Sequence, residues 1–468
     1  MAAADSCIDL RVDFITESVV KTVGLTPKPY ILTLSNFDLL SGRFPVTYFY
    51  FFRSPNQFHS SLSHKITENL KASLAQCLSL FYPFAGRIVA NPKTDEPEIM
   101  CDNHGVLVVE AQANIRLKEL QFYNLNKYVE RGKLVPSRQD DFAVQIQITR
   151  YTCGGLSLTF TFDHALGDAS SFAKFLVTWS ELATNKPPSC SPDHRRFLLR
   201  PRFPPRYNTS LDQTFVSCSL DDILNMRPLS SSTIMLKRLY YIDASSIQKL
   251  QKLASEDGMS RKRTKIEAFS AYIWKVMVNA VDKSRSKCKM GWLVDGRTRI
   301  AGTTGDNLVM SDYIGNVLSL TFGELSMDEL KHGSISEIAS HVHAAISTAT
   351  NAEHFLDLID WIECHRPGLM LSKMVLGRDN GPTAALVVSS GRRFPVGALD
   401  FGFGSPVLGT VCSTIERIGV GYMNQRPSGR GDGSWTVSAI LWPEMVAALE
   451  SHSDCIFQPI TAHNLHLS

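Results

Sequence analysis

The sequence lacks several features that would place the chain in a membrane or on nucleic acid. No run approaches the ~20 consecutive apolar residues that a transmembrane helix needs. No long block of one charge occurs either, and 48 Lys and Arg are balanced by 45 Asp and Glu, which leaves a net charge of +3. This balance indicates neither a basic surface that binds nucleic acid nor a polybasic membrane anchor, although it is compatible with a small anionic ligand.

Patterned cysteines and targeting signals are also absent. The ten cysteines include no Cys-x-x-Cys pair, and no His-Glu-x-x-His segment occurs, so we expect reduced thiols and no bound metal. The first ten residues contain two acids and no Lys or Arg, and no apolar core of a signal peptide follows them. We therefore expect a cytoplasmic protein that does not bind a membrane.

What is present is the composition of an ordinary globular protein, 44% hydrophobic and 20% charged. A chain of 468 residues is too long for a single compact core, so two domains are expected. Residues 189–210 are rich in proline and arginine and have neither helical nor strand periodicity, which indicates an exposed connection. We predict an N-terminal domain over 1–195, a linker over 196–215 and a C-terminal domain over 216–468.

The segment Thr-Phe-Asp-His-Ala-Leu-Gly-Asp at 161–168 is the most informative part of the sequence. Before it, apolar and polar residues alternate over 142–148 and 156–162, with Cys-Gly-Gly at 153–155 between them, which predicts a hairpin with a half-buried second strand. After it, apolar residues recur at the helical period over 172–183. Gly167 separates the two elements, so His164 is expected where a strand ends and a turn begins.

A histidine in that position can act as a general base. A neutral imidazole can take a proton from an alcohol or amine that attacks an activated acyl group, which typically accelerates the reaction by ~10² to 10⁴. No Gly-x-Ser-x-Gly motif supplies a nucleophile, so direct attack by the acceptor in a ternary complex is favoured over a covalent acyl-enzyme. A structural histidine, a hydrolase and a non-catalytic ligand-binding protein are the alternative interpretations.

Two motifs and several landmarks resemble one family along almost the whole chain. His-x-x-x-Asp occupies 164–168, and Asp-Phe-Gly-Phe-Gly at 400–404 is similar to that family's Asp-Phe-Gly-Trp-Gly. Further landmarks are Leu-Ser-Asn-Phe-Asp at 34–38, Tyr-Pro-Phe-Ala-Gly-Arg at 82–87, Val-Asp-Gly-Arg at 294–297 and Tyr-Ile-Gly-Asn at 313–316. On these residues the chain is identified as a member of the plant BAHD acyl-CoA-dependent acyltransferases.

The resemblance implies an α/β fold of two chloramphenicol-acetyltransferase-like domains with an active-site tunnel at their interface. Acyl-CoA would enter the tunnel from one face and the acceptor from the other, with His164 between them as the general base. Acyl-CoA is then a co-substrate, no cofactor is bound permanently, and a monomer that binds only small molecules is expected.

The resemblance also assigns structural roles to both motifs. Asp168 is expected to point away from the substrate and to pair with Arg297, while Gly167 belongs to the same motif. In the second motif, Asp400, Gly402 and Gly404 are expected to be structural and to lie near the CoA channel. Phe403 keeps an aromatic body where the family has Trp but loses the indole N–H.

Thr264 and Arg263 are the candidate contacts for CoA. Thr264 and Glu267 have the spacing of a capping box, and residues 266–280 are predicted to form a buried helix. Free backbone amides at the N-terminus of this helix would favour a phosphate, and family members often contact CoA through a Ser or Thr at this position. The alternative for the basic residues 261–263 is a solvated face.

The resemblance assigns the acceptor side to Ser389, Gly391 and Arg393, together with Phe44 from the N-terminal part. Gly391 replaces the Trp of the family's Thr-Ser-Trp segment, which predicts an enlarged pocket without an indole N–H and makes Ser389 a candidate donor to the oxyanion. Arg393 aligns with the arginine that binds the acceptor carboxylate in hydroxycinnamoyl-CoA:shikimate transferases. Arg43 stands where those enzymes carry a histidine.

The identity of the acceptor rests on two further stretches. Residues 35–46 and 400–406 look more like the branch that contains coniferyl alcohol acyltransferases, so a phenylpropanoid alcohol is the expected acceptor. A shikimate- or quinate-type acid is the first alternative, and phenolic, fatty, steroidal and amine acceptors also remain open. The sequence does not identify the acyl donor.

Overall fold

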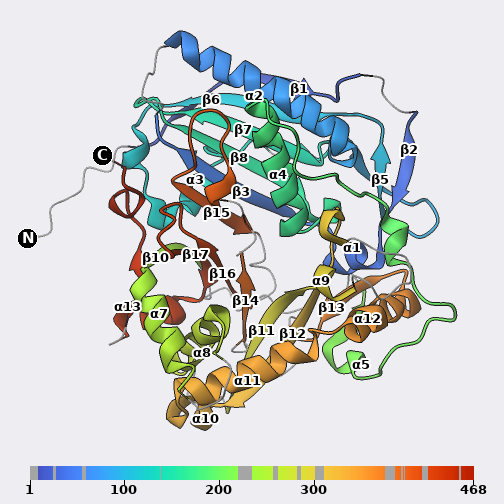
Figure 1. The fold of residues 1–468 in the computed structure, drawn as a ribbon, viewed down its shortest axis with the longest axis vertical. Coiled ribbons are helices and arrows are strands. Elements are labelled where there is room, and N and C mark those ends of the chain that lie inside the picture. The colour runs from blue at the N-terminus through green and yellow to red at the C-terminus, as the bar shows by residue number, and fades with distance from the viewer. Residues whose placement is uncertain are drawn as a thin grey trace, which may run out of the picture.

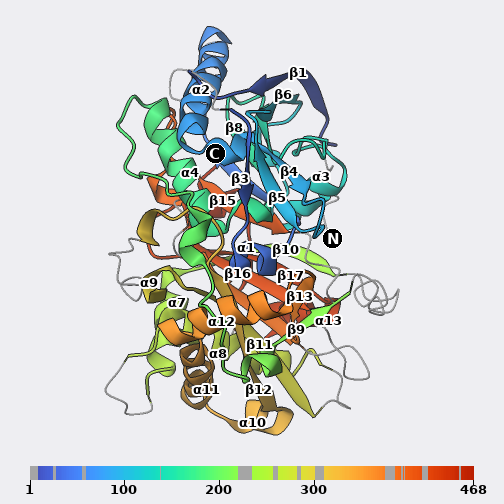
Figure 2. The same ribbon diagram turned by 90° about the vertical axis from the view of Figure 1, so that its right-hand side faces the viewer.

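The computed structural model describes residues 9–24, 28–54, 60–137, 139–219, 235–256, 262–281, 286–300, 310–374, 385–391, 394, 396–413, 420–452 and 455–467. Its framework consists of two large β-sheets with helices packed against them (Figure 1). In Figure 2 the first sheet lies in the upper half of the molecule and the second sheet in the lower half. The predicted α/β fold class with two sheet-rich units is confirmed.

The first sheet has six strands, one of which ends beside His164. In spatial order they are β1 (Val12–Val20), β6 (Val106–Ala113), β7 (Val144–Arg150), β8 (Leu156–Asp163), β3 (Pro45–Phe52) and β15 (Leu408–Ser413). Helices α2 (Ser60–Leu80) and α4 (Ala169–Ala183) pack together over one face of this sheet (Figure 1). Their apolar stripes bury side chains such as Phe160, Phe172 and Trp179 in a single core, which fixes the sheet beneath the helices.

The second sheet has seven strands and a core of its own. In spatial order they are β12 (Leu318–Ser326), β11 (Lys287–Asp295), β14 (Ala385–Ser390), β16 (Gly421–Pro427), β17 (Trp435–Leu441), β10 (Leu236–Ile242) and β18 (Gln458–Pro459). Helix α8 (Lys265–Met277) is buried almost all round, and α7 (Ala244–Leu253), α11 (Ile335–Thr348) and α13 (Pro443–Ser451) pack against it. The predicted capping box of Thr264 and Glu267 at its start is confirmed.

Shorter elements complete the two units. A small sheet has the order β2 (Tyr30–Thr33), β5 (Pro97–Cys101), β4 (Arg87–Ala90), and β13 (Leu369–Ser372) pairs with β9 (Phe215–Cys218). The remaining helices are α1 (Asn36–Ser41), α3 (Asn126–Glu130), α5 (Leu211–Thr214), α9 (Arg297–Ile300), α10 (Met327–His332) and α12 (Ala352–His365). The 3₁₀ turns include η1 (Tyr82–Ala85), η4 (His164–Leu166), η5 (Arg196–Leu199) and η7 (Val396–Ala398).

Each half of the chain contributes to the other half's unit. Strand β15, which lies within 216–468, pairs antiparallel with β3 and completes the edge of the first sheet. Helix α1, from the N-terminal part, contacts α12 and β13 of the second half. The sheets therefore do not follow the predicted sequence boundaries, and the junction between them is built from both halves.

The strand that ends at His164 is buried on both faces, whereas alternation predicted burial on one. The predicted hairpin is present, since β7 and β8 pair antiparallel. The polar residues Ser157 and Thr159, however, are fully buried. Residues of the loop-rich segment 115–134 cover this second face together with Phe49 and Phe51, so polar character here does not mean exposure to water.

The segment 189–210 was expected to be exposed, and this is wrong for three of its side chains. His194, Arg196 and Leu199 are buried. The Nε atom of Arg196 lies 2.9 Å from Oδ2 of the buried Asp38, although not in hydrogen-bonding geometry. An ion pair with a carboxylate of the N-terminal part thus draws this connection into the interior.

Candidate active site

His164 begins the η4 turn directly after β8, as the strand–turn pattern predicted. The Asp163 carboxylate caps the turn by accepting a hydrogen bond from the Ala165 N–H. The His164 N–H donates to the Phe44 carbonyl at 3.0 Å, and the Phe44 ring stacks on the imidazole with centroids 4.6 Å apart. The predicted substrate-binding residue Phe44 therefore fixes the plane of the His164 ring.

The environment of the His164 ring favours its neutral form. Nδ1 is buried and has no hydrogen-bond partner among the described residues. Burial lowers the pKa of His164 below its ordinary value of 6.5, although the carboxylates of Asp168, Asp163 and Asp38 act in the opposite direction. A neutral imidazole at neutral pH has a free lone pair, which is what a general base requires.

Asp168 and Arg297 form a buried two-point ion pair, the contact that the resemblance implied. Arg297 Nη1 lies 2.8 Å from Oδ2 of Asp168, and Nη2 lies 3.0 Å from Oδ1. Burial alone would raise the pKa of Asp168, but Arg297 holds that pKa below its usual value. The carboxylate also accepts hydrogen bonds from Ser170 N and Ser171 N and thereby caps α4, so its role in the structure is to join α4 to α9.

Gly167 lies where two chain segments approach closely. A Cβ at this position would stand 2.8 Å from the Cβ of Ser171 and 3.4 Å from the Cα of Gly315, and the φ angle of Gly167 is +157°. The Ser171 hydroxyl donates to the Gly315 carbonyl at 2.8 Å. The glycine of the His-x-x-x-Asp motif therefore permits contact between the η4 turn and the 313–316 landmark.

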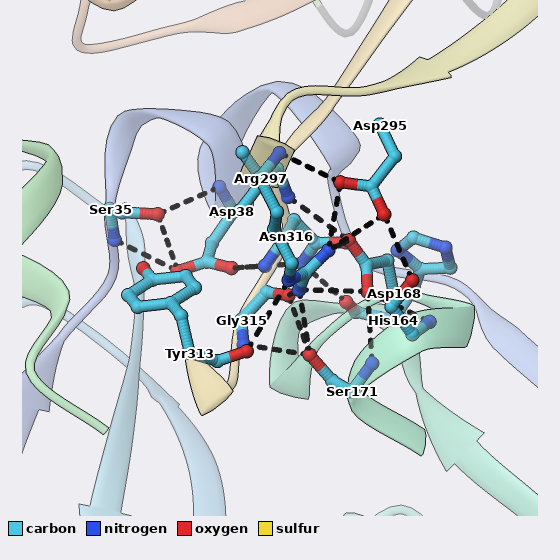
Figure 3. A network of polar contacts seen from close by, with 12 residues as sticks. Ser35, Asp38, His164, Asp168, Ser171, Asp295, Arg297, Tyr313, Gly315 and Asn316 are labelled. Atoms are coloured by element: carbon cyan, nitrogen blue, oxygen red, sulfur yellow. Dashed lines mark hydrogen bonds and ion pairs between the residues drawn. The ribbon is translucent and has the colours of Figure 1, made fainter. Parts of the chain in front are cut away.

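Asp38 and Asn316 hold the backbone of His164, and neither was among the predicted site residues (Figure 3). Asn316 donates to Asp38 Oδ1 through its backbone N–H at 2.7 Å and through Nδ2 at 2.9 Å. Nδ2 lies 3.0 Å from the His164 carbonyl. The Ser35 hydroxyl donates to Asp38 Oδ2 at 2.7 Å. The 34–38 and 313–316 landmarks were the sequence signal for this network, but the contact between them is visible only in the structure.

The 400–404 motif forms a turn organised by Asp400. Its Oδ1 accepts hydrogen bonds from Gly402 N at 2.8 Å and Gly404 N at 3.0 Å. Both glycines have φ near +95°, a backbone region that disfavours other residues. The Phe401 ring packs on Trp179 at a centroid distance of 5.0 Å, so the motif joins the C-terminal part to the first core.

Thr264 and Arg263 make protein contacts at the start of α8. The Thr264 hydroxyl donates to Glu267 Oε2 at 2.8 Å and accepts from Glu267 N at 3.3 Å. Arg263 is buried, and its Nη2 donates to the Ser340 hydroxyl at 2.8 Å. Thr264 is exposed. Of the two candidate CoA contacts, Thr264 thus stands at the surface and Arg263 in the interior.

The expected enlargement at Gly391 is wrong, because another side chain fills the space. A Cβ on Gly391 would lie 2.5 Å from Cγ of Arg426 and 2.8 Å from the Gln425 carbonyl oxygen. Ser389 is on β14, where its hydroxyl accepts a hydrogen bond from Asn424 Nδ2 at 3.2 Å. Arg393 lies outside the described residues. The segment 389–391 therefore packs against β16, and the side chain of Arg426 fills the space beside Gly391.

The described residues give no evidence of a metal site or of a membrane-spanning helix. No group of three or more His, Cys, Asp and Glu side chains there is arranged to hold a metal ion, and no helix there is long and apolar enough to cross a membrane. A cavity of about 690 Å³ lies beside residues 191–197 and Tyr82, and His164 does not line it.

Comparisons with known proteins found relatives that match most of the chain. The model of the Transferase family matches residues 10–455. Anthranilate N-benzoyltransferase protein 1 of Dianthus caryophyllus is 29% identical, with 90% of this chain and 94% of the relative covered. Shikimate O-hydroxycinnamoyltransferase of Nicotiana tabacum is 26% identical, with 94% and 99% covered. The crystal structure of vinorine synthase is similar in fold, with a TM-score of 0.70 at 20% identity over 97% of this chain and 100% of that chain.

Proposed function

Because the chain belongs to the Transferase family, that of the BAHD acyl-CoA-dependent acyltransferases, we propose that His164 is the general base of acyl transfer from CoA to a hydroxyl group. The protein is an acyl-CoA-dependent acyltransferase. The observation that supports the role of His164 is its position: the residue is half-buried at the end of β8, burial lowers its pKa, and Asn316 holds its backbone carbonyl at 3.0 Å. We propose further that it works as a cytoplasmic monomer.

The proposed reaction proceeds in a ternary complex. His164 accepts the proton of the acceptor hydroxyl as its oxygen attacks the thioester carbon. The tetrahedral intermediate collapses with cleavage of the carbon–sulfur bond, and protonated His164 returns the proton to the CoA thiolate. A fixed histidine contributes mainly through orientation and proton transfer, since the thioester is already activated.

The proposed acceptor is a phenylpropanoid alcohol such as coniferyl alcohol. Support for it comes from the sequences at 35–46 and 400–406. The relatives' names include acceptors as different as anthranilate and shikimate, so the family alone leaves the acceptor open. A second candidate is an acidic alcohol of the shikimate or quinate type, and the buried Arg426 beside Gly391 favours it.

Release of CoA with and without acceptor tests the reaction type. We expect rapid release with acetyl-CoA or p-coumaroyl-CoA only when an acceptor is added, because the acceptor hydroxyl is the proposed nucleophile. Release at the same rate without acceptor would indicate a hydrolase. No release from folded protein across a broad panel of donors and acceptors would indicate a non-catalytic protein that binds CoA esters.

A further inference from the structure

Arg426 is a buried cation for which the described part of the chain supplies no carboxylate partner. It lies on β16 with 2% of its surface exposed. Nε donates to the Asn424 side-chain oxygen at 2.6 Å, whereas Nη1 is buried and has no hydrogen-bond partner among the residues that the structure describes. None of the ion pairs found among the described residues includes Arg426. Arg297, the comparable buried arginine, pairs with Asp168, so the two sites differ in how the charge is neutralised.

Two aromatic rings of the first core, Phe394 and Tyr48 of β3, contact the Arg426 guanidinium. Its Cζ lies 3.7 Å from the centroid of the Phe394 ring and 4.9 Å from that of Tyr48. The Tyr50 ring lies parallel to Phe394 at 5.6 Å. The Tyr50 hydroxyl is buried and, like Nη1 of Arg426, has no partner among the described residues. Strands of both sheets thus bring two unpartnered donors to the same aromatic cluster.

The position of this cluster connects it with the acceptor side. The side chain of Arg426 occupies the space that a side chain at residue 391 would take. Gly391 directly follows β14, and together with Ser389 it belongs to the segment that the resemblance assigns to the acceptor. Cation–π contacts offset part of the penalty of burying a charge, but a buried cation without an anion remains unfavourable.

We propose that Arg426, assisted by the Tyr50 hydroxyl, binds a carboxylate of the acceptor. This inference rests on the proposed acyl transfer and develops its second candidate acceptor, an acidic alcohol, in place of a neutral phenylpropanoid alcohol. Arginine suits the role because its planar guanidinium offers paired N–H donors to the two carboxylate oxygens. The aromatic cluster excludes water and strengthens the ion pair formed on binding. Arg426 is then a specificity-determining residue for the acceptor.

Binding of matched neutral and charged probes tests this proposal directly. Calorimetry would measure shikimate and methyl shikimate with CoA-saturated protein, without turnover. We expect the wild-type protein to bind the acid at least about tenfold more tightly than the ester. Arg426→Met is expected to reduce this ratio to about one, and Arg426→Lys to retain part of it because the charge remains. Tyr50→Phe is expected to lower the ratio less than Arg426→Met.

Arg238→Met is the matched control, because Arg238 also lies over a tyrosine ring, that of Tyr123, at 5.1 Å. It should leave the ratio unchanged. A wild-type ratio near one, or no binding of either probe, would overturn the proposal. Equal weakening of both probes by Arg426→Met, with a lower Tm, would also overturn it and identify a structural arginine.

A second pair of probes separates acceptor from donor. A carboxylate could also be carried by a dicarboxylic acyl donor. If Arg426 binds the acceptor instead, the ratio of the Kd values of malonyl-CoA and acetyl-CoA should be the same in wild type and in Arg426→Met. If this ratio changes in Arg426→Met, the carboxylate that Arg426 binds belongs to the acyl donor, and the acceptor assignment is overturned. CoA release with coniferyl alcohol is measured separately, so failure of acyl transfer remains distinguishable from failure of the anion site.

Discussion

At the residue scale, the proton affinity of His164 is the property on which the chemistry depends. Three carboxylates lie close enough to favour the imidazolium, yet burial has the larger influence and lowers the pKa. Of the three, Asp168 acts most strongly against this lowering, but its carboxylate is hydrogen-bonded to Arg297 at 2.8 Å. The structure therefore separates the base from the aspartate of its own motif, and His164 need not act with Asp168 as a dyad.

The pH dependence of the rate follows from this lowered pKa. His164 loses its function as a base when it is protonated, so kcat/KM should stay level above the ordinary pKa of 6.5 and fall only below it. The profile would be measured with coniferyl alcohol, which does not titrate, between about pH 5 and pH 8. A fall that begins at or above pH 6.5 would show that the nearby carboxylates outweigh burial.

Sequence patterns predicted some residues of the site and missed others for a physical reason. The place of His164 follows from a strand that ends and a helix that begins, both of which are local. Asn316 and Arg196 act over 152 and 158 positions, through contacts with the His164 backbone and with Asp38, and no local pattern reports such contacts. The opposite error occurred at Gly391, where a missing side chain predicted space that Arg426 occupies.

At the scale of elements, Asp168 serves two purposes, since it caps α4 and neutralises Arg297. Asp168→Ala is expected to destabilise the fold by about 3 to 5 kcal/mol, because it leaves the Arg297 charge buried and unpaired. Urea unfolding would measure this change. In the double variant Asp168→Ala/Arg297→Met the loss should be smaller than the sum of the two single losses.

A matched control is available at α7, where Asp243 caps the helix by accepting from Ser246 N. Asp243→Ala should cost only about 1 kcal/mol, the usual effect of losing an N-cap. Equal losses for Asp168→Ala and Asp243→Ala would mean that the buried ion pair adds nothing to stability beyond the cap.

The start of α8 allows the cap and the proposed CoA contact of Thr264 to be separated. Thr264→Ala should lower stability by about 1 kcal/mol through loss of the capping box and should raise the KM for acyl-CoA. Thr264→Ser keeps the hydroxyl and should behave like the wild type in both measurements. Unchanged KM with reduced stability would leave Thr264 as a cap alone.

Elements were predictable where their signal is local. The hairpin of β7 and β8 and the capping box of α8 both appear as spacing in the sequence. The burial of Ser157 and Thr159 could not be predicted in this way, because it depends on the segment 115–134 that folds over the second face of the sheet. Alternation indicates which side chains share a face, but not what covers that face.

At the scale of the whole molecule, the two sheets depend on each other. The edge of the first sheet is β15, and its core includes Phe394, Leu399 and Phe401. A fragment of residues 1–215 is therefore expected not to fold alone, because β3 would expose an unpaired edge and the core would lose these side chains. Circular dichroism and size-exclusion chromatography would measure this, and a stable, compact fragment would contradict the expectation.

Length and composition predicted two units, but not their interleaving. The rule that consecutive segments pack together places residues 216–468 in one body, whereas β15 returns to the first sheet. Which distant strands pair depends on how their side chains pack in the folded core, and a local sequence pattern does not report this. The 400–404 turn, whose Phe401 packs on Trp179, is one point at which the return is fixed.

The central claim is that His164 is the base of a direct acyl transfer to an alcohol. The measurement that tests it is mass-spectrometric detection of product with purified wild type and His164→Ala, using acetyl-CoA and p-coumaroyl-CoA against coniferyl alcohol and shikimate. We predict an ester in the wild type and a rate lower by about 10² to 10⁴ in His164→Ala, with unchanged thermal unfolding. Equal product from both proteins would contradict the role of His164.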